Sequence, residues 1–152
     1  MDGKLNYFAY GSNMDTERIL ERGVLFSKRF HAVLEGWKLE FNKISYRNPN
    51  EGFANIVPCK GNFVEGVLYE INSSDLSKLD KYEGYPEHYK RIKVQVRLDN
   101  GMQLEAVTHV ANPKKIRDGL KPSREYLNHL LKGCDLLSKE YCEKLRLQKT
   151  LD

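Results

Sequence analysis

The chain has few cysteines, and they follow neither a metal-binding pattern nor a disulfide-rich one. Cys59, Cys134 and Cys142 are an odd number, and no secretory signal precedes them, which argues against a disulfide framework. Pairing Cys134 with Cys142 would require a turn that folds them together, so we expect three reduced thiols. No Cys-x-x-Cys motif and no Cys/His cluster at metal-ligand spacing is present, so we expect no metal site.

Long apolar runs and blocks of like charge are also missing. No stretch approaches the roughly 18 apolar residues of a membrane span, and Met1–Asn6 lacks the apolar segment of a secretory signal. We therefore expect a cytoplasmic protein with no membrane partner. The net charge of +4 is compatible with an anionic small molecule or with weak nucleic-acid binding. Because basic residues alternate with acidic ones, a solvated mixed-charge surface and no nucleic-acid partner are favoured.

The composition is that of one soluble globular domain. Of the 152 residues, 40% are hydrophobic and 30% charged, which suffices for one core. No internal repeat or linker divides the chain, so a single domain is expected over residues 1–152. The chain is expected to contain both helices and strands, with the strands more numerous, which indicates an α+β fold.

Alternation of apolar and polar residues predicts five or six strands. They are expected at residues 5–10, 37–41, 53–57 and 63–71, and in a hairpin of 92–98 and 102–106 that turns at Asn100-Gly101. Residues 43–52 are polar and predict a loop, and Pro58 is expected to stop a strand. Gly66 indicates a bulge or a close backbone approach. Strands paired mostly with neighbours would close into a small mixed β-barrel or a strongly curved sheet.

Capping residues and apolar spacing predict four helices. They are expected at residues 15–22, 72–83, 122–132 and 138–148. Asn13 or Asp15 would cap the first helix and Asn72 the second. Gly23, Gly84 and Gly133 would end the first three.

The first segment with potential chemistry runs from Tyr7 to Met14. A strand reaches Gly11, and Ser12 and Asn13 precede a helix, so backbone N–H groups there are free to attract a carboxylate or a developing oxyanion. Gly11 would let a ligand approach the backbone. A plain strand-turn-helix with Asn13 as cap fits equally well. Ser12 as a hydrolase nucleophile is disfavoured, because it lacks a Gly-x-Ser-x-Gly frame and an evident histidine partner.

The second segment surrounds Glu83, at the end of the helix that begins near Asn72. The partial negative charge of a helix C-terminus and burial both disfavour an ionised carboxylate. Such a carboxyl group can take up a proton and return it, as a general acid/base does. The alternative is a glutamate exposed to solvent at a helix end.

Together the two segments resemble the γ-glutamylcyclotransferase-like (AIG2-like) family. The motifs are Tyr10-Gly11-Ser12-Asn13 and the acidic segment from Asp80 to Tyr89, which contains Glu83 and Pro86. The resemblance extends over residues 6–147. Further matches are Ala54–Pro58, Gly66–Ile71, Pro122-Ser123, Tyr126, Gly133, Tyr141 and Leu145.

This resemblance implies a small β-barrel flanked by helices and a γ-glutamylcyclotransferase activity. The α-amine of a small γ-glutamyl substrate would attack its own γ-carbonyl, with Glu83 as general acid/base, releasing 5-oxoproline and a free amino acid or amine. No cofactor or metal is implied, and the protein would be a monomer or homodimer. Residues expected to bind substrate are Tyr7, Tyr10, Gly11, Ser12, Asn13 and Tyr89.

Alternatives remain within the same resemblance. The leaving group could be a larger acylated amine, as in a γ-glutamylamine cyclotransferase, or the chain could be a non-catalytic ligand-binding member. Glutathione is a less expected substrate, because the glutathione-degrading branch differs after Tyr-Gly-Ser. The chain also departs from the family pattern at His109, where a pocket tyrosine is expected. His109 could replace that tyrosine's hydrogen bond, indicate a different leaving group, or face solvent from its strand.

Overall fold

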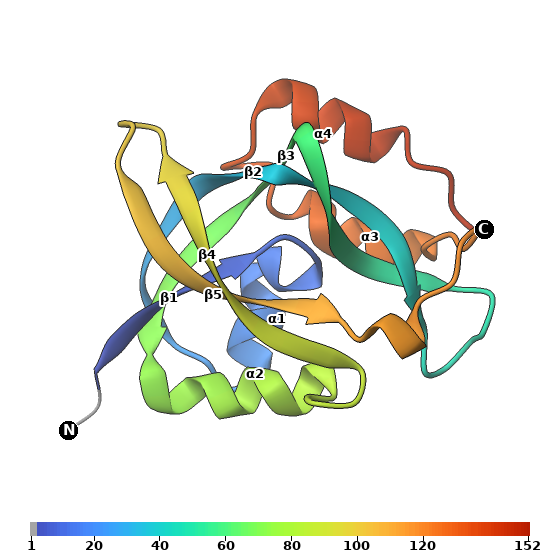
Figure 1. Ribbon diagram of the computed structural model, residues 1–152, viewed down its shortest axis with the longest axis horizontal. Helices are drawn as coiled ribbons and strands as arrows, with labels where there is room; N and C mark the ends of the chain where they lie inside the picture. Colours follow the sequence, from blue (N-terminus) through green and yellow to red (C-terminus); the bar gives the residue numbers. More distant parts are fainter. Residues whose placement is uncertain (1–2) are drawn as a thin grey trace.

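The computed structural model describes residues 3–152 and shows a closed five-stranded barrel with helices packed around it (Figure 1). The predicted α+β barrel is therefore confirmed. The strands are β1 (Lys4–Ala9), β2 (Phe26–Ile44), β3 (Gly52–Asn72), β4 (Tyr89–Leu98) and β5 (Gln103–Ala111). The helices are α1 (Thr16–Glu21), α2 (Leu76–Glu83), α3 (Arg124–Leu131) and α4 (Lys139–Arg146), with 3-10 turns η1 (Ser12–Met14), η2 (Ser73–Asp75) and η3 (Pro113–Lys115). None of the helices within the described residues has the length and apolar character needed to cross a membrane.

The barrel closes between its first and last strands. The order is β1-β3-β2-β4-β5, and every pair is antiparallel except β1 with β5, which meet in parallel at Tyr7 and Val107. Closure leaves the sheet without free edges along this seam. It also brings the carboxyl end of β1, where the Tyr-Gly-Ser-Asn segment begins, beside residues near position 109.

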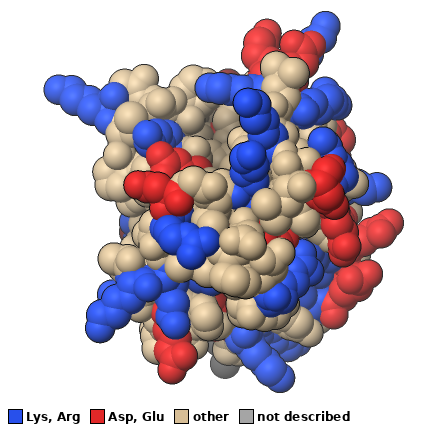
Figure 2. Space-filling model, turned by 90° about the vertical axis from the view of Figure 1, so that its right-hand side faces the viewer, with Lys and Arg blue, Asp and Glu red and all other residues tan. Residues whose placement is uncertain are grey.

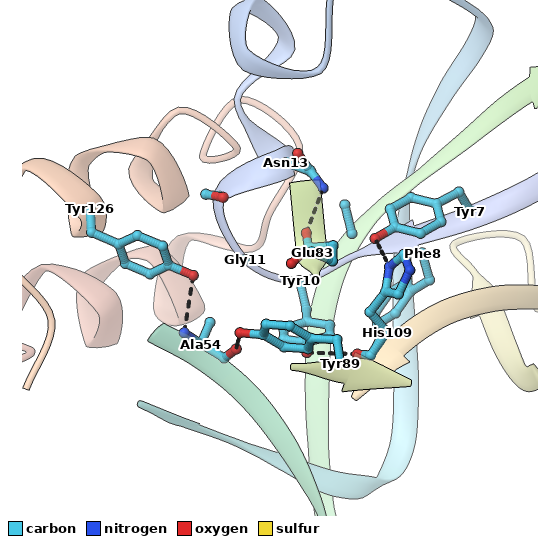
Figure 3. Close-up of a pocket in the computed structure, with 12 residues that line it drawn as sticks. Tyr7, Phe8, Tyr10, Gly11, Asn13, Ala54, Glu83, Tyr89, His109 and Tyr126 are labelled. Carbon is cyan, nitrogen blue, oxygen red and sulfur yellow. Dashed lines mark hydrogen bonds between the residues drawn. The ribbon is translucent and has the colours of Figure 1, made fainter. Parts of the chain in front are cut away.

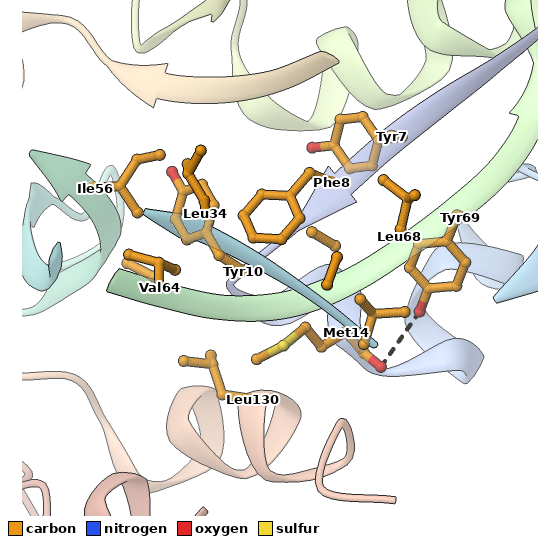
Figure 4. Close-up of a cluster of buried hydrophobic side chains, with 14 of the residues drawn as sticks. Tyr7, Phe8, Tyr10, Met14, Leu34, Ile56, Val64, Leu68, Tyr69 and Leu130 are labelled. Atoms are coloured by element: carbon orange, nitrogen blue, oxygen red, sulfur yellow. Dashed lines mark hydrogen bonds between the residues drawn. The ribbon is translucent and has the colours of Figure 1, made fainter. Parts of the chain in front are cut away.

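The hydrophobic core fixes the turn that follows β1. Phe8, Met14, Tyr69 and Leu130 are buried in one cluster that joins the barrel to α3 (Figure 4). The hydroxyl of Tyr69 also donates to the backbone carbonyl of Asn13 at 2.7 Å. Because side chains from β1, β3 and α3 all hold this turn, its backbone is placed by the core rather than by the loop's own sequence.

Three strand predictions required correction. β2 begins at Phe26, well before residue 37, and extends to Ile44, so Lys43 lies in a strand. β3 runs from Gly52 through Pro58 to Asn72 without the predicted stop. Pro58 pairs with Trp37 at a register shift in β2, and β1 pairs only with residues 67–72 of β3. The missing N–H of Pro58 therefore costs β3 little, because no second strand lies beside it there.

The predicted close approach at Gly66 is confirmed. A Cβ atom there would lie 2.4 Å from the carbonyl oxygen of Ala9 and 2.8 Å from the ring of Phe8.

The predicted helix caps were partly correct. The Asp15 side chain accepts from the backbone N–H of Glu17, whereas Asn72 makes no side-chain capping bond.

The expectation of three reduced cysteines was wrong for two of them. Cys134 and Cys142 form a disulfide with their Cα atoms 5.8 Å apart, and Cys59 is free. The turn between α3 and α4 brings the two cysteines together, and sequence spacing alone did not reveal that turn.

The surface carries charges of both signs. On the face shown in Figure 2, lysine and arginine side chains lie among acidic ones, as the alternation of charges predicted.

Candidate active site

A small cavity of about 30 Å³ lies at the carboxyl end of β1 (Figure 3). All seven site residues predicted from the sequence line it, although they come from barrel strands, α2, η1 and the link between β1 and η1. The lining residues are Tyr7, Phe8, Ala9, Tyr10, Gly11, Ser12, Asn13, Ala54, Glu83, Tyr89, His109 and Tyr126. Within residues 3–152, no group of three or more His, Cys, Asp or Glu side chains could hold a metal ion.

Ser12 and Asn13 of the η1 turn form part of the cavity wall. The N–H groups of Met14 and Asp15 donate to the carbonyls of Gly11 and Ser12 at 3.0 and 3.2 Å. The turn's own hydrogen bonds therefore do not use the N–H groups at its start, as at any helix N-terminus. A Cβ atom at Gly11 would lie 3.2 Å from Cβ of Ala54. The absence of a side chain at Gly11 therefore lets the backbone of this wall pack closely against Ala54.

Glu83 is the last residue of α2, which Gly84 ends in a left-handed conformation with φ of 68°. Its Oε1 accepts from Nδ2 of Asn13 at 3.2 Å, and Nη1 of Arg22 lies 3.6 Å away. The side chain is only 19% exposed, so it is not a solvated glutamate at a helix end. Asn13 and Arg22 thus both lie beside the same carboxylate oxygen, Oε1.

Arg22 was missed as a site residue by sequence reasoning. Its Nη1 also donates to Oδ1 of Asn13 at 2.8 Å, so the Asn13 amide lies between Arg22 and Glu83. Arg22 is the last residue of the predicted first helix and caps the carboxyl end of α1. Nothing in its spacing from Glu83 signalled the contact, which depends on how α1 and α2 are placed by the barrel.

Three of the cavity tyrosines are buried and hydrogen-bonded to backbone groups. The hydroxyls of Tyr10 and Tyr89 donate to the carbonyls of His109 and Ala54 at 2.7 and 2.8 Å. Tyr126 accepts from the N–H of Ala54 at 3.0 Å. Burial, followed by the nearby charge of Glu83 for Tyr10 and by neighbouring tyrosines for Tyr89, raises the pKa of both hydroxyls, so they stay protonated at neutral pH. Tyr126 was noted from the sequence only as a family match.

His109 is 2% exposed, so the alternative of a solvent-facing histidine was wrong. Its Nε2 lies 2.8 Å from Oδ1 of Asp80, and its Nδ1 lies 2.7 Å from the hydroxyl of Tyr7. A carboxylate only accepts, so in neutral His109 the proton sits on Nε2 and Nδ1 accepts from Tyr7. With His109 neutral, the Tyr7 hydroxyl therefore donates to His109 and keeps its oxygen lone pairs for other groups.

The cavity opens into a larger groove of about 910 Å³, and the two share Ser12, Glu83, Tyr89 and Tyr126. The groove is lined by five lysine and arginine side chains against three carboxylates. The basic residues are Arg18, Arg22, Lys43, Arg47 and Lys81, and the acidic ones are Glu21, Glu83 and Glu125. A molecule that reaches Glu83 therefore extends into a groove with an excess of positive charge.

Comparison with known proteins matches both the fold and the sequence. A family profile described as gamma-glutamyl cyclotransferase, AIG2-like, matches residues 7–128. Human gamma-glutamylcyclotransferase is 32% identical over 146 residues, which are 92% of this chain and 76% of the human protein. The putative gamma-glutamylcyclotransferase YkqA of Bacillus subtilis is 32% identical over 145 residues, covering 92% of this chain and 50% of that protein.

Solved structures agree with these matches. A gamma-glutamyl cyclotransferase structure superposes with a TM-score of 0.87 at 30% identity, covering 99% of this chain and 90% of that one. A yeast cyclotransferase specific to glutathione superposes with a TM-score of 0.71 at 14% identity, which shows a shared fold alone. Barrel, cavity and relatives together define an enzyme of the cyclotransferase class. The chain belongs to the γ-glutamyl cyclotransferase, AIG2-like family.

Proposed function

We propose that this enzyme cyclises the glutamyl group of a γ-glutamyl compound to 5-oxoproline and releases a free amino acid or amine. One observation carries the proposal. Among the described residues that line the inner cavity, Glu83 has the only carboxylate, and it lies across from the η1 turn, hydrogen-bonded to Asn13 at 3.2 Å. A single acid/base group beside a backbone anion site is what this reaction requires.

The substrate supplies its own nucleophile. Its α-amine has a pKa of roughly 7.7–8.0 in the free state, so at neutral pH it must first lose a proton, which Glu83 accepts. The amine nitrogen then bonds to the γ-carbonyl carbon and closes a five-membered ring, an intramolecular step favoured by proximity. The bond from that carbon to the leaving nitrogen breaks as Glu83 gives its proton to the departing amine. The ring nitrogen then releases its second proton to the freed carboxylate or to solvent, which leaves the neutral lactam. No redox step or cofactor enters.

The remaining cavity groups hold the glutamyl group in its folded conformation. Backbone N–H groups of Gly11, Ser12 and Asn13 bind either the α-carboxylate or the oxyanion formed at the γ-carbon. The hydroxyl oxygen of Tyr7, whose proton is directed to His109, accepts from the α-ammonium group. Tyr10 and Tyr89 shape the wall through their backbone hydrogen bonds. The cavity and the groove share Glu83 and Tyr89, so a glutamyl group held at Glu83 leaves the rest of the substrate in the groove.

Mass spectrometry of 5-oxoproline tests the proposal. Purified protein is incubated with γ-glutamyl amino acids, γ-glutamyl amines and glutathione, with the Glu83→Gln variant in parallel. Formation of 5-oxoproline by the wild type only is expected. If a folded wild-type protein bound these compounds and produced no 5-oxoproline from any of them, a non-catalytic binding role would replace the proposal.

A further inference from the structure

Lys43 is a buried lysine in the wall of the groove. It lies in β2, and the residue is 1% exposed. Its Nζ donates to the carbonyl of Ile44 at 2.5 Å and lies 5.6 Å from the ring centroid of Tyr89 and 5.7 Å from that of Phe53. The ammonium group is therefore held between aromatic rings, with one backbone carbonyl as acceptor.

No carboxylate within residues 3–152 forms an ion pair with Lys43, although Glu83 acts on it from a longer distance. Burial first, and then the positive charge of Lys115, lower the pKa of Lys43 to about 8, so it is still mostly charged at neutral pH. A buried charge without a partner destabilises a fold, and a hydrophobic residue of similar size would avoid that cost. An anion that binds in the groove would supply the missing partner.

The position of Lys43 indicates which part of the substrate this anion belongs to. Tyr89 lines both the inner cavity and the groove, and Lys43 lies beside its ring on the groove side. The leaving nitrogen must depart next to Glu83, so whatever is attached to that nitrogen passes Tyr89. The group that meets Lys43 is therefore on the leaving half of the substrate.

Three other cations of the groove are engaged or exposed. Arg22 binds Asn13 beside Glu83, and Arg47 makes two 2.9 Å hydrogen bonds to the carboxylate of Glu51. Lys81 lines the groove from α2 and is exposed to solvent. Arg18, the fourth, is only partly buried and forms no ion pair with a carboxylate within residues 3–152. Lys43 differs from these because it is fully buried and has no carboxylate partner among the described residues.

We infer that Lys43 binds a carboxylate of the leaving group, an inference that rests on the proposed function. The substrate is then a γ-glutamyl amino acid or peptide rather than a γ-glutamyl amine. In an α-amino acid the carboxylate is one carbon from the departing nitrogen. It therefore enters the groove directly beside Glu83. A charge-assisted hydrogen bond to Lys43 in a site with little water selects for this group.

Two substrates that differ only by the carboxylate test the inference. γ-Glutamylalanine and γ-glutamylethylamine release alanine and ethylamine, and both yield 5-oxoproline. In Lys43→Met, loss of a charge-assisted hydrogen bond is expected to raise KM for γ-glutamylalanine by about 10- to 100-fold and to leave KM for γ-glutamylethylamine within about threefold. The Lys60→Met variant removes the same charge from an exposed residue of β3 that does not line the groove, and it is expected to leave both KM values nearly unchanged.

The thermal midpoint of Lys43→Met separates binding from a structural role. It is expected to equal or exceed that of the wild type, because the unpaired ammonium is replaced by a chain of similar volume. Equal changes in KM for both substrates, or none for γ-glutamylalanine, would overturn the inference. If the wild type forms no 5-oxoproline from any substrate, the proposed function fails. In that case, thermal shift with γ-glutamylalanine still tests the anion site. A shift in the wild type but not in Lys43→Met would support it, and equal shifts in both would overturn it.

Discussion

The hydroxyl of Tyr7 lies 2.7 Å from Nδ1 of His109, although the two residues are 102 positions apart in the chain. Asp80 holds the opposite ring nitrogen at 2.8 Å, and Nε of Arg91 lies 3.6 Å from the other oxygen of Asp80. This chain of contacts runs from the surface of the barrel to the inner cavity. It sets the direction in which Tyr7 donates its proton.

We predict that His109 acts through Tyr7. His109→Leu and Tyr7→Phe are each expected to lower kcat/KM by about 10-fold, the value of roughly one buried hydrogen bond. The double variant should lose little more than either single one, because both changes remove the same interaction. His109→Asn, which keeps an acceptor near the Nδ1 position, should recover part of the activity. Losses that multiply in the double variant would show that His109 acts independently of Tyr7.

Glu83→Gln is expected to keep the fold and to lower kcat by about 10²- to 10⁴-fold, the usual contribution of general acid/base transfer. The amide oxygen can still accept from Asn13, so thermal melting should change little. Ser12→Ala serves as the comparison, since Ser12 is proposed to act through its backbone. It should retain substantial 5-oxoproline formation. Complete inactivity of a folded Ser12→Ala protein would favour a hydrolase with a covalent intermediate.

Gly66→Ala should destabilise the barrel without a direct effect on the site chemistry. The added Cβ would lie 2.4 Å from a backbone oxygen of β1, so the β1–β3 pair must separate, at about 1–3 kcal/mol for overpacking. Gly3→Ala is the matched control, because its Cβ would meet only the Ser73 hydroxyl at 4.0 Å. Urea unfolding of both variants measures the difference. Equal midpoints would contradict the close approach at Gly66.

His31 should make stability depend on pH. Burial alone would lower the pKa of His31, but hydrogen bonds from its ring nitrogens to Asp99 and Glu65 outweigh burial and raise it. A raised folded-state pKa stabilises the protein fully below the unfolded value of about 6.5, and this contribution is lost as pH rises through the folded value. The free energy of unfolding should therefore fall with increasing pH above about 6.5 in the wild type.

The His31→Gln variant isolates this effect from other titrating groups. Its stability should be lower than that of the wild type at low pH, and the difference between the two proteins should shrink as pH increases. Urea unfolding at a series of pH values provides the comparison. A difference that stays constant with pH would mean that the charge of His31 does not contribute.

Features that depend on neighbouring residues were predictable from the chain alone. The alternation around Asn100-Gly101 gave the β4–β5 hairpin, and Gly84 ended α2 as expected. Local patterns were misleading where tertiary pairing compensated for them. Pro58 breaks a strand pattern locally, yet β3 continues because only β2 pairs with it there.

The amino-acid sequence by itself determined the secondary structure of most segments, the α+β class and the two motifs that contain Gly11 and Glu83. These depend on side-chain periodicity, turn residues and residue type, which are local properties. Only the tertiary structure decided that β1 closes against β5, that Arg22 reaches Glu83 and that His109 is buried against Tyr7. It also decided that Lys43 lies in the groove with no carboxylate partner from residues 3–152. Each of these depends on strand register and barrel closure, because contacts between distant residues are set by how whole elements pack.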